Sequence, residues 1–153
     1  MSTHFEKGRA VMVDVSGKPE TARQALAEST VLLPEAAATA LRAKETRKGD
    51  AVAVAELAGI MAAKRTGELI PLCHPLPLTR VTVTGELIGD RVRFEACCKT
   101  TARTGVEMEA LTAVSVAALT LYDMLKGISK GIEITAIRLL AKEGGRSGTW
   151  RRS

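Results

Sequence analysis

The sequence predicts an α+β domain in which helices cover one face of a mostly antiparallel sheet. Apolar and polar residues alternate over 81–87 and again over 92–98, with Gly89-Asp90 between the two runs. This is the pattern of a β-hairpin closed by a two-residue turn. A second observation is the apolar segment 105–125, which is long enough for a helix of several turns. The expected elements follow one another as strand, helix, helix, hairpin, helix and strand, and this order favours a layered α+β fold.

The chain begins with a polar stretch, residues 1–22, which we expect to be a flexible arm with one apolar patch at 11–13. Residues 23–33 leave two interpretations open, because their alanine-rich start suits a helix whereas their β-branched, alternating end suits a strand. Pro34 then opens a helix that extends to Lys44, since proline is favoured in the first helical turn.

A second helix is expected after Asp50, whose carboxylate can cap the helix N-terminus. Its apolar stripe should face the core, and Gly67 should end it, because glycine is favoured just beyond a helix C-terminus. The predicted stripe consists of Val54, Leu57, Ala58 and Met61. Three prolines within 69–78 exclude a regular helix and disfavour a central strand, so this segment should be an extended apolar loop.

The helix expected over 105–125 is preceded by Thr104 and contains Glu107, the spacing of a capping box. This helix is apolar nearly all round, so we expect the sheet to cover one side and another element or subunit to cover the other. A last strand should occupy 132–141, where a slip in the alternation near Ala136-Ile137 indicates a bulge or burial on both faces. The glycine-rich residues 144–148 lack the spacing of a phosphate-binding loop and suggest a flexible tail.

The length of 153 residues and the composition fit a single soluble domain with a basic balance. The net charge of +5 favours an anionic partner such as a nucleic acid, a phosphorylated metabolite or a membrane surface, although a merely basic soluble protein fits equally well. Nucleic-acid binding is disfavoured, because the hairpin offers only Phe94 as a stacking aromatic and that residue falls on the core face. The longest strongly apolar uncharged run, 110–122, is shorter than the roughly 20 residues that span a membrane.

Three cysteines cannot form a closed set of disulfides, and Cys97 and Cys98 are neighbours, so we expect free thiols in a reducing cytoplasm. Residues 1–9 contain no apolar stretch of the kind found in a secretory signal. Cys73 and His74 lack the further ligands and the spacing of a zinc site, so no metal site is predicted. On its apolar loop His74 needs a polar partner, which is either a ligand or the backbone.

Five charged positions could also contribute to a site, and each has a purely structural interpretation. Lys48 precedes a helix N-terminus, where an anion could bind, but a solvated lysine in a turn would give the same pattern. Asp123 and Lys126 share one face of the long helix, as part of a site or as a surface ion pair. Glu107 suits the cap of that helix, and Glu109 suits the positive end of its dipole. These carboxylates would have a further role only if a site supplied cations or hydrogen-bond donors.

Eight segments of the chain are similar, in the same order, to those of one known family, over most of the length from about residue 12 to residue 148. The segments are 12–16, 48–50, 58–60, 62–66, 70–76, 104–113, 122–124 and 139–142. On these segments the chain resembles the MoaC family of cyclic pyranopterin monophosphate synthases, which act in molybdenum cofactor biosynthesis. Arg103 stands where lysine is expected in the family, so the charge is kept.

The resemblance implies a ferredoxin-like α+β sandwich, with a single catalytic domain at 23–143 between the arm at 1–22 and a flexible basic tail at 144–153. It implies a homohexamer built as a trimer of dimers, with the active site between subunits. The implied activity is that of a lyase that converts 3′,8-cyclo-7,8-dihydroguanosine 5′-triphosphate to cyclic pyranopterin monophosphate and diphosphate. We expect no redox cofactor, no nucleic acid and no membrane as partners, and the sequence leaves open whether Mg²⁺ assists.

The resemblance also implies roles for individual residues. Lys48 and Lys126 are the expected proton-transfer residues, and Asp123 would keep Lys126 charged or orient it. His74 would donate to substrate oxygens, and Glu109 would accept hydrogen bonds from ring N–H groups. The full set of expected substrate-binding residues is Leu72, Cys73, His74, Met108 and Glu109, followed by Glu107, Arg23 and Lys142. The alternative is a non-catalytic module that binds a phosphorylated metabolite.

Overall fold

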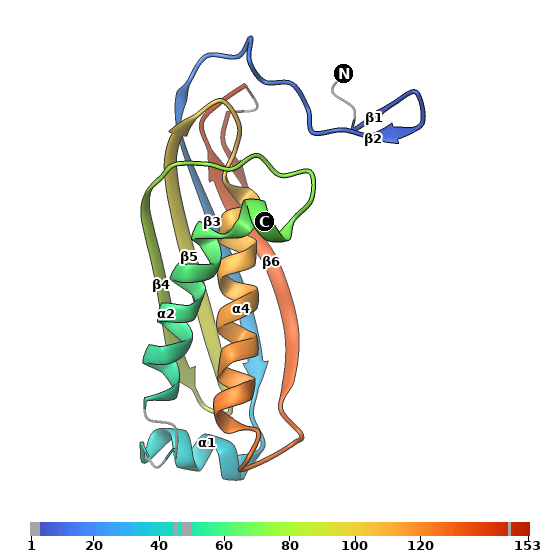
Figure 1. The fold of residues 1–153 in the computed structure, drawn as a ribbon. Coiled ribbons are helices and arrows are strands. Elements are labelled where there is room, and N and C mark those ends of the chain that lie inside the picture. Colours follow the sequence, from blue (N-terminus) through green and yellow to red (C-terminus); the bar gives the residue numbers. More distant parts are fainter. Residues whose placement is uncertain (1–3, 45, 47–49, 147) are drawn as a thin grey trace.

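The computed structural model describes residues 4–44, 46, 50–146 and 148–153. It has two layers, a five-stranded sheet and the helices that cover one of its faces (Figure 1). The strand order is β4-β5-β3-β6-β7, and every neighbouring pair is antiparallel. The predicted α+β fold is therefore confirmed. The elements are β1 (Phe5–Glu6), β2 (Arg9–Ala10), β3 (Thr21–Leu32), α1 (Glu35–Arg42), α2 (Ala51–Lys64), α3 (Thr66–Leu69), β4 (Leu78–Ile88), β5 (Arg91–Ala102), α4 (Glu107–Leu125), β6 (Glu133–Glu143) and β7 (Trp150–Arg151).

β3 lies in the middle of the sheet between β5 and β6, so residues 23–32 are part of a strand and not of a helix. Its alternate side chains from Ala25 to Val31 are buried. A segment that pairs along both edges satisfies its backbone groups within the sheet, and this outweighs the helix propensity of its alanines. The helix predicted after Pro34 is confirmed as α1.

The core between sheet and helices consists largely of alanine, and it brings α2 and α4 close together. The buried positions of α2 are all small residues: Ala51, Ala55, Gly59, Ala62 and Ala63. A β-carbon added to Gly59 would lie 2.8 Å from the carbonyl oxygen of Ala113 in α4. Contact at that distance forces a neighbour to move, so the two helix backbones approach each other as closely as glycine allows.

This packing makes the predicted apolar stripe of α2 wrong. Val54, Leu57 and Met61 are exposed at 39%, 58% and 47%, because the small residues occupy the face that meets α4 and the larger ones point outward. Leu119 on α4 is exposed as well, at 59%. The outer surface of the helix layer therefore presents large apolar side chains to its surroundings.

Two predicted helix ends also differ from the structure, whereas the cap by Asp50 is confirmed: its carboxylate accepts from the backbone N–H of Ala53. α2 ends at Lys64, and Gly67 lies inside the short helix α3. At the start of α4, no side chain caps the N-terminus among the residues described, so the predicted capping box is wrong. Glu107 forms an ion pair with a lysine of β6 instead of turning back to the cap position.

The hairpin and the last predicted strand follow the predicted pattern closely, whereas the short strands β1, β2 and β7 lie in segments that were predicted to be a flexible arm and tail. β4 and β5 are joined at Gly89-Asp90, and Gly89 has φ +63°, a conformation that glycine adopts without strain. β6 pairs with β3 through two register shifts, one beside Thr30/Val31 and one beside Leu26/Ala27. The first shift lies next to Ala136, which confirms the predicted bulge.

By length and composition alone, α4 is the one helix in the described part of the chain that could cross a membrane. Half of that apolar stretch is buried inside the structure, where α4 packs on β3, β5 and α2. Core packing therefore accounts for its hydropathy.

We expect Gly59→Leu to lower the free energy of unfolding by about 3 kcal/mol, or to prevent folding, because the new side chain must push α2 away from α4. Ala53→Leu is the matched control: Ala53 is exposed on the same helix, and its substitution should change stability by no more than about 0.5 kcal/mol. Urea unfolding followed by circular dichroism measures both variants. Equal stability of the two would show that the helices do not pack through Gly59.

Candidate active site

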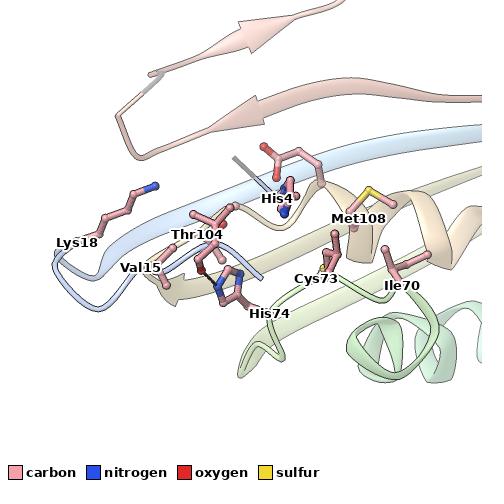
Figure 2. Close-up of a pocket in the computed structure, with 12 residues that line it drawn as sticks. His4, Val15, Lys18, Ile70, Cys73, His74, Thr104 and Met108 are labelled. Atoms are coloured by element: carbon pink, nitrogen blue, oxygen red, sulfur yellow. Dashed lines mark hydrogen bonds between the residues drawn. The ribbon is translucent and has the colours of Figure 1, made fainter. Parts of the chain in front are cut away.

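A cavity of about 370 Å³ opens where the N-terminal arm, the loop after α3 and the start of α4 meet. Figure 2 shows the side chains that surround it, with His4, Val15 and Lys18 coming from the arm and Cys73 and His74 from the loop. The cavity brings together five residues that were expected to bind substrate: Leu72, Cys73, His74, Glu107 and Met108. They come from two segments that are more than thirty residues apart in the sequence.

The loop that carries Cys73 and His74 is extended, as its prolines predict, and His74 ties it to the arm. The Nε2 atom of His74 lies 2.5 Å from the carbonyl oxygen of Val13. A carbonyl oxygen only accepts hydrogen bonds, so Nε2 must be the donor and Nδ1 retains an acceptor lone pair in the neutral ring. Of the two partners left open for His74, a ligand or the backbone, the backbone is present, and the same ring also lines the cavity.

Glu109 lies behind this loop and is almost completely buried, with 2% of its surface exposed. Its Oε1 atom accepts a hydrogen bond from the thiol of Cys73 at 3.8 Å, and its Oε2 atom has no hydrogen-bond partner in the part of the chain that the structure describes. Burial raises the pKa of Glu109 to about 7. Burial, with the nearby Glu109 as the next cause, raises the pKa of Cys73 to about 11, so this thiol acts as a hydrogen-bond donor and not as a nucleophile.

Two predicted cationic residues are not among those that line this cavity. Lys142 of β6 forms an ion pair with Glu107, with 2.5 Å between Nζ and Oε1. Arg23, near the start of β3, donates from Nε to the carbonyl oxygen of Ala102 at 3.1 Å. Arg23 lines a second cavity, and Lys18 lines both.

The contribution of the arm was not predicted from the sequence. Val13, Val15 and Lys18 line the cavity, together with Thr104 before α4. The only signal available was that residues 12–16 matched a known family in a stretch otherwise interpreted as a flexible arm. A polar arm without a regular period gives no indication of what it packs against.

Asp123 and Lys126 lie at the other end of α4. They form an ion pair of 3.0 Å, and both side chains are 55% exposed. Fifteen residues of helix separate Asp123 from Met108, a distance of about 22 Å at 1.5 Å per residue. One copy of the chain therefore does not bring this pair to the cavity.

Lys48, the third residue expected in catalysis, lies outside the described residues. Within those residues, no three His, Cys, Asp or Glu side chains lie close enough together to hold a metal ion.

Comparison with known proteins identifies the family. The model of the MoaC family matches residues 12–145. A protein of Rhodospirillum rubrum named cyclic pyranopterin monophosphate synthase is 56% identical over 99% of this chain and 93% of its own length. Proteins with the same name from Thermomicrobium roseum and Deinococcus radiodurans are 58% and 54% identical, over 98% and 97% of this chain and 92% and 89% of their own lengths. The cavity segments 70–76 and 104–109 lie inside the matched range, and the chain belongs to the MoaC family.

Proposed function

We propose that this chain is a cyclic pyranopterin monophosphate synthase, a lyase that acts early in molybdenum cofactor biosynthesis. The proposed reaction converts 3′,8-cyclo-7,8-dihydroguanosine 5′-triphosphate to cyclic pyranopterin monophosphate and diphosphate. The observation that supports this proposal most directly is a cavity lined by His74 and Glu107, with the buried carboxyl of Glu109 behind the His74 loop and Lys142 paired with Glu107. Relatives with this activity in their names match nearly the full chain.

The substrate ring would occupy the 370 Å³ cavity between the arm and the loop. Glu109 would bind its N–H groups, because the unpartnered Oε2 atom lacks the donor that a guanine-derived ring supplies. Near neutral pH this carboxyl exchanges a proton readily, since its pKa is raised to about 7. His74 would donate to substrate oxygens, and Leu72, Cys73 and Met108 would form the wall around the ring.

The proposed proton-transfer residues are Lys126 and Lys48, with Asp123 orienting Lys126. Lys126 and Asp123 lie about 22 Å along α4 from the cavity of their own subunit. We therefore propose that they complete the cavity of a neighbouring subunit. The exposed Val54, Leu57 and Leu119 on the outer surface of the helix layer support an assembly, because apolar patches of this kind are usually covered by another protein surface.

The assembly we propose is a hexamer, a trimer of dimers, in the cytoplasm. Lys142, held by Glu107, and Arg23 would bind the triphosphate, because charge-assisted hydrogen bonds from lysine and arginine suit phosphate oxygens. The reaction rearranges protons and transfers a phosphoryl group without net oxidation, so we propose that no redox cofactor takes part. Whether Mg²⁺ assists with the phosphates is a matter for assays with and without a chelator.

The function is tested directly by incubating the protein with the triphosphate substrate and measuring cyclic pyranopterin monophosphate and diphosphate. We expect one diphosphate for each cyclic product. Lys48→Ala and Lys126→Ala should each lower kcat by at least about 100-fold while the oligomer survives, because general acid–base residues typically contribute that much. Tight binding of substrate without product in the unchanged protein would support the non-catalytic alternative.

A mixing experiment tests whether the site is shared between subunits. His74→Ala and Lys126→Ala should each be inactive alone, but assembled together they should recover roughly a quarter of the activity. The reason is that half of the random dimers are mixed, and in a symmetric dimer each mixed pair keeps one site with both residues intact. Activity that stays absent after co-assembly, verified by affinity capture of differently tagged subunits, would mean that His74 and Lys126 act within one subunit.

The buried Glu109 predicts a specific dependence of stability on pH. Its pKa rises from 4.5 to about 7 on folding, so the folded protein binds more protons than the unfolded chain between these values. The stabilising contribution is therefore complete below pH 4.5 and is lost as the pH rises to 7, at up to about 1.4 kcal/mol per pH unit. Urea unfolding at pH 5 and pH 8 should show a smaller loss for Glu109→Gln than for the unchanged protein.

The control for that measurement is Glu68→Gln, which changes an exposed carboxylate on α3. Its stability should fall between pH 5 and pH 8 as much as that of the unchanged protein. If Glu109→Gln behaves like this control, the proton held by Glu109 does not contribute to stability.

A further inference from the structure

The chain contains two histidines, and both line the cavity of about 370 Å³. His74 comes from the extended loop and was expected at the site. His4 comes from the N-terminal arm and was not among the residues that sequence reasoning assigned to the site. In the view of Figure 2 its ring lies between Thr104 and Met108, which line the same cavity. The fold therefore gathers both imidazoles of the chain at one place.

A tight hairpin in the arm positions His4. Its two short strands, β1 and β2, are joined at Lys7-Gly8. Both turn residues have positive φ, 52° and 77°, as a type I′ turn requires. A turn of this kind fixes which residues of the two strands face each other. His4 faces Val11, whose backbone N–H donates to the carbonyl oxygen of His4 at 2.7 Å.

The imidazole of His4 is held by the strand that it faces. Its Nδ1 atom lies 3.2 Å from the carbonyl oxygen of Val11. A carbonyl oxygen only accepts hydrogen bonds, so Nδ1 must carry the hydrogen atom, and Nε2 keeps an acceptor lone pair in the neutral ring. The contact with the arm thus leaves Nε2 as the nitrogen that can accept a hydrogen bond from a ligand.

The same stretch of the arm also holds the other histidine. Two residues beyond Val11, the carbonyl oxygen of Val13 accepts a hydrogen bond from Nε2 of His74. The two rings are therefore bound through opposite nitrogens, Nδ1 in His4 and Nε2 in His74. One short backbone segment orients both imidazoles at the cavity.

A ligand that carries O–H and N–H groups needs hydrogen-bond acceptors in this cavity. The carboxylate of Glu107 is already paired with Lys142, and Lys18 offers only donors. The thiol of Cys73 donates to the carboxyl behind the loop. The Nε2 atom of His4 can accept from such a ligand without breaking the hydrogen bond between Nδ1 and Val11.

We propose that His4 is a substrate-binding residue, whose Nε2 atom accepts a hydrogen bond from an O–H or N–H group of the bound nucleotide. This inference deepens the proposed function and rests on it, because the ribose and the guanine-derived ring supply those donors. A neutral imidazole aligns the substrate without adding charge to the site. The arm that carries His4 forms one wall of the occupied cavity.

The hydrogen positions on the two rings can be measured in the absence of ligand. In protein labelled with ¹⁵N-histidine only two imidazoles give NMR signals, and the spectrum of His4→Asn assigns them. At a pH at which both rings are neutral, we expect the hydrogen on Nδ1 in His4 and on Nε2 in His74. A neutral His4 ring with its hydrogen on Nε2 overturns the proposal, because that nitrogen could not accept a hydrogen bond.

GTP is the probe for binding, because it supplies ribose O–H and guanine N–H groups and lacks the bond between C3′ and C8 that the substrate carries. Its addition to the labelled protein should shift the Nε2 signal of His4, since accepting a hydrogen bond changes the electron density at that nitrogen. An Nε2 signal of His4 that does not move at millimolar GTP overturns the proposal.

Two substitutions separate substrate binding from support of the arm. His4→Asn keeps an amide donor near the position of Nδ1, so the contact with Val11 survives, but it has no atom at the position of Nε2. His4→Gln reaches the position of Nε2 and can accept there. We expect the Kd for GTP and the KM for the triphosphate substrate to rise about fivefold in His4→Asn, as for the loss of one hydrogen bond. Both constants should recover partly in His4→Gln.

Glu6→Gln is the matched control, because Glu6 is exposed on the same hairpin and does not line the cavity. It should leave the Kd and the KM unchanged. If His4→Asn matches this control, or if His4→Gln is impaired more than His4→Asn, the ring of His4 only supports the arm and the proposal is overturned.

Failure of this inference can be separated from failure of the proposed function. If the unchanged protein forms no cyclic product, the function is wrong, and the GTP titration still decides whether His4 binds a guanine nucleotide. If product forms while the KM and the Kd are unchanged in His4→Asn, His4 does not bind the substrate and the function stands.

Discussion

The near-contact between α2 and α4 above the sheet determines the rest of this structure. Only 3% of the residues are aromatic, so the core cannot be filled by bulky rings, and native packing density must come from backbones that approach closely. Alanine at positions such as Ala55 and Ala117, and glycine at Gly59, permit that approach. Two consequences follow. The start of α4 is held firmly beside the loop of Cys73 and His74, and the larger apolar side chains of the helices are left on the outside.

The elements that could be predicted are those in which apolar and polar side chains repeat with a clear period along the sequence. The hairpin alternates strictly and is closed by Gly89-Asp90, so its turn was found to the residue. β3 stayed ambiguous because alanine fits either helix or strand, and pairing on both edges decides the outcome only in the folded chain. The α2 stripe was mispredicted because large apolar residues were taken to mark the buried face, whereas close packing buried the small ones.

For the site, sequence reasoning grouped residues that are neighbours in the chain and stopped where distant segments meet. Leu72, Cys73 and His74 form one run, and Met108 belongs to a second, so each was identified as a group. The packing of the arm against His74 through the carbonyl of Val13 depends on a backbone atom, which every residue possesses and no sequence pattern marks. The raised pKa of Glu109 likewise arises from burial, which a carboxylate at a helix start does not indicate by itself.

The straight course of α4 also constrains how this chain can change in length. One inserted residue would turn Asp123 by about 100° about the helix axis and shift it by about 1.5 Å relative to Met108. The two ends of the helix would then present different faces, so α4 can accept substitutions but neither insertions nor deletions. The turn at Gly89-Asp90 joins two strands at an exposed tip, where an added residue would not rotate one part of a site relative to another. We therefore expect homologous chains to vary in length at this turn.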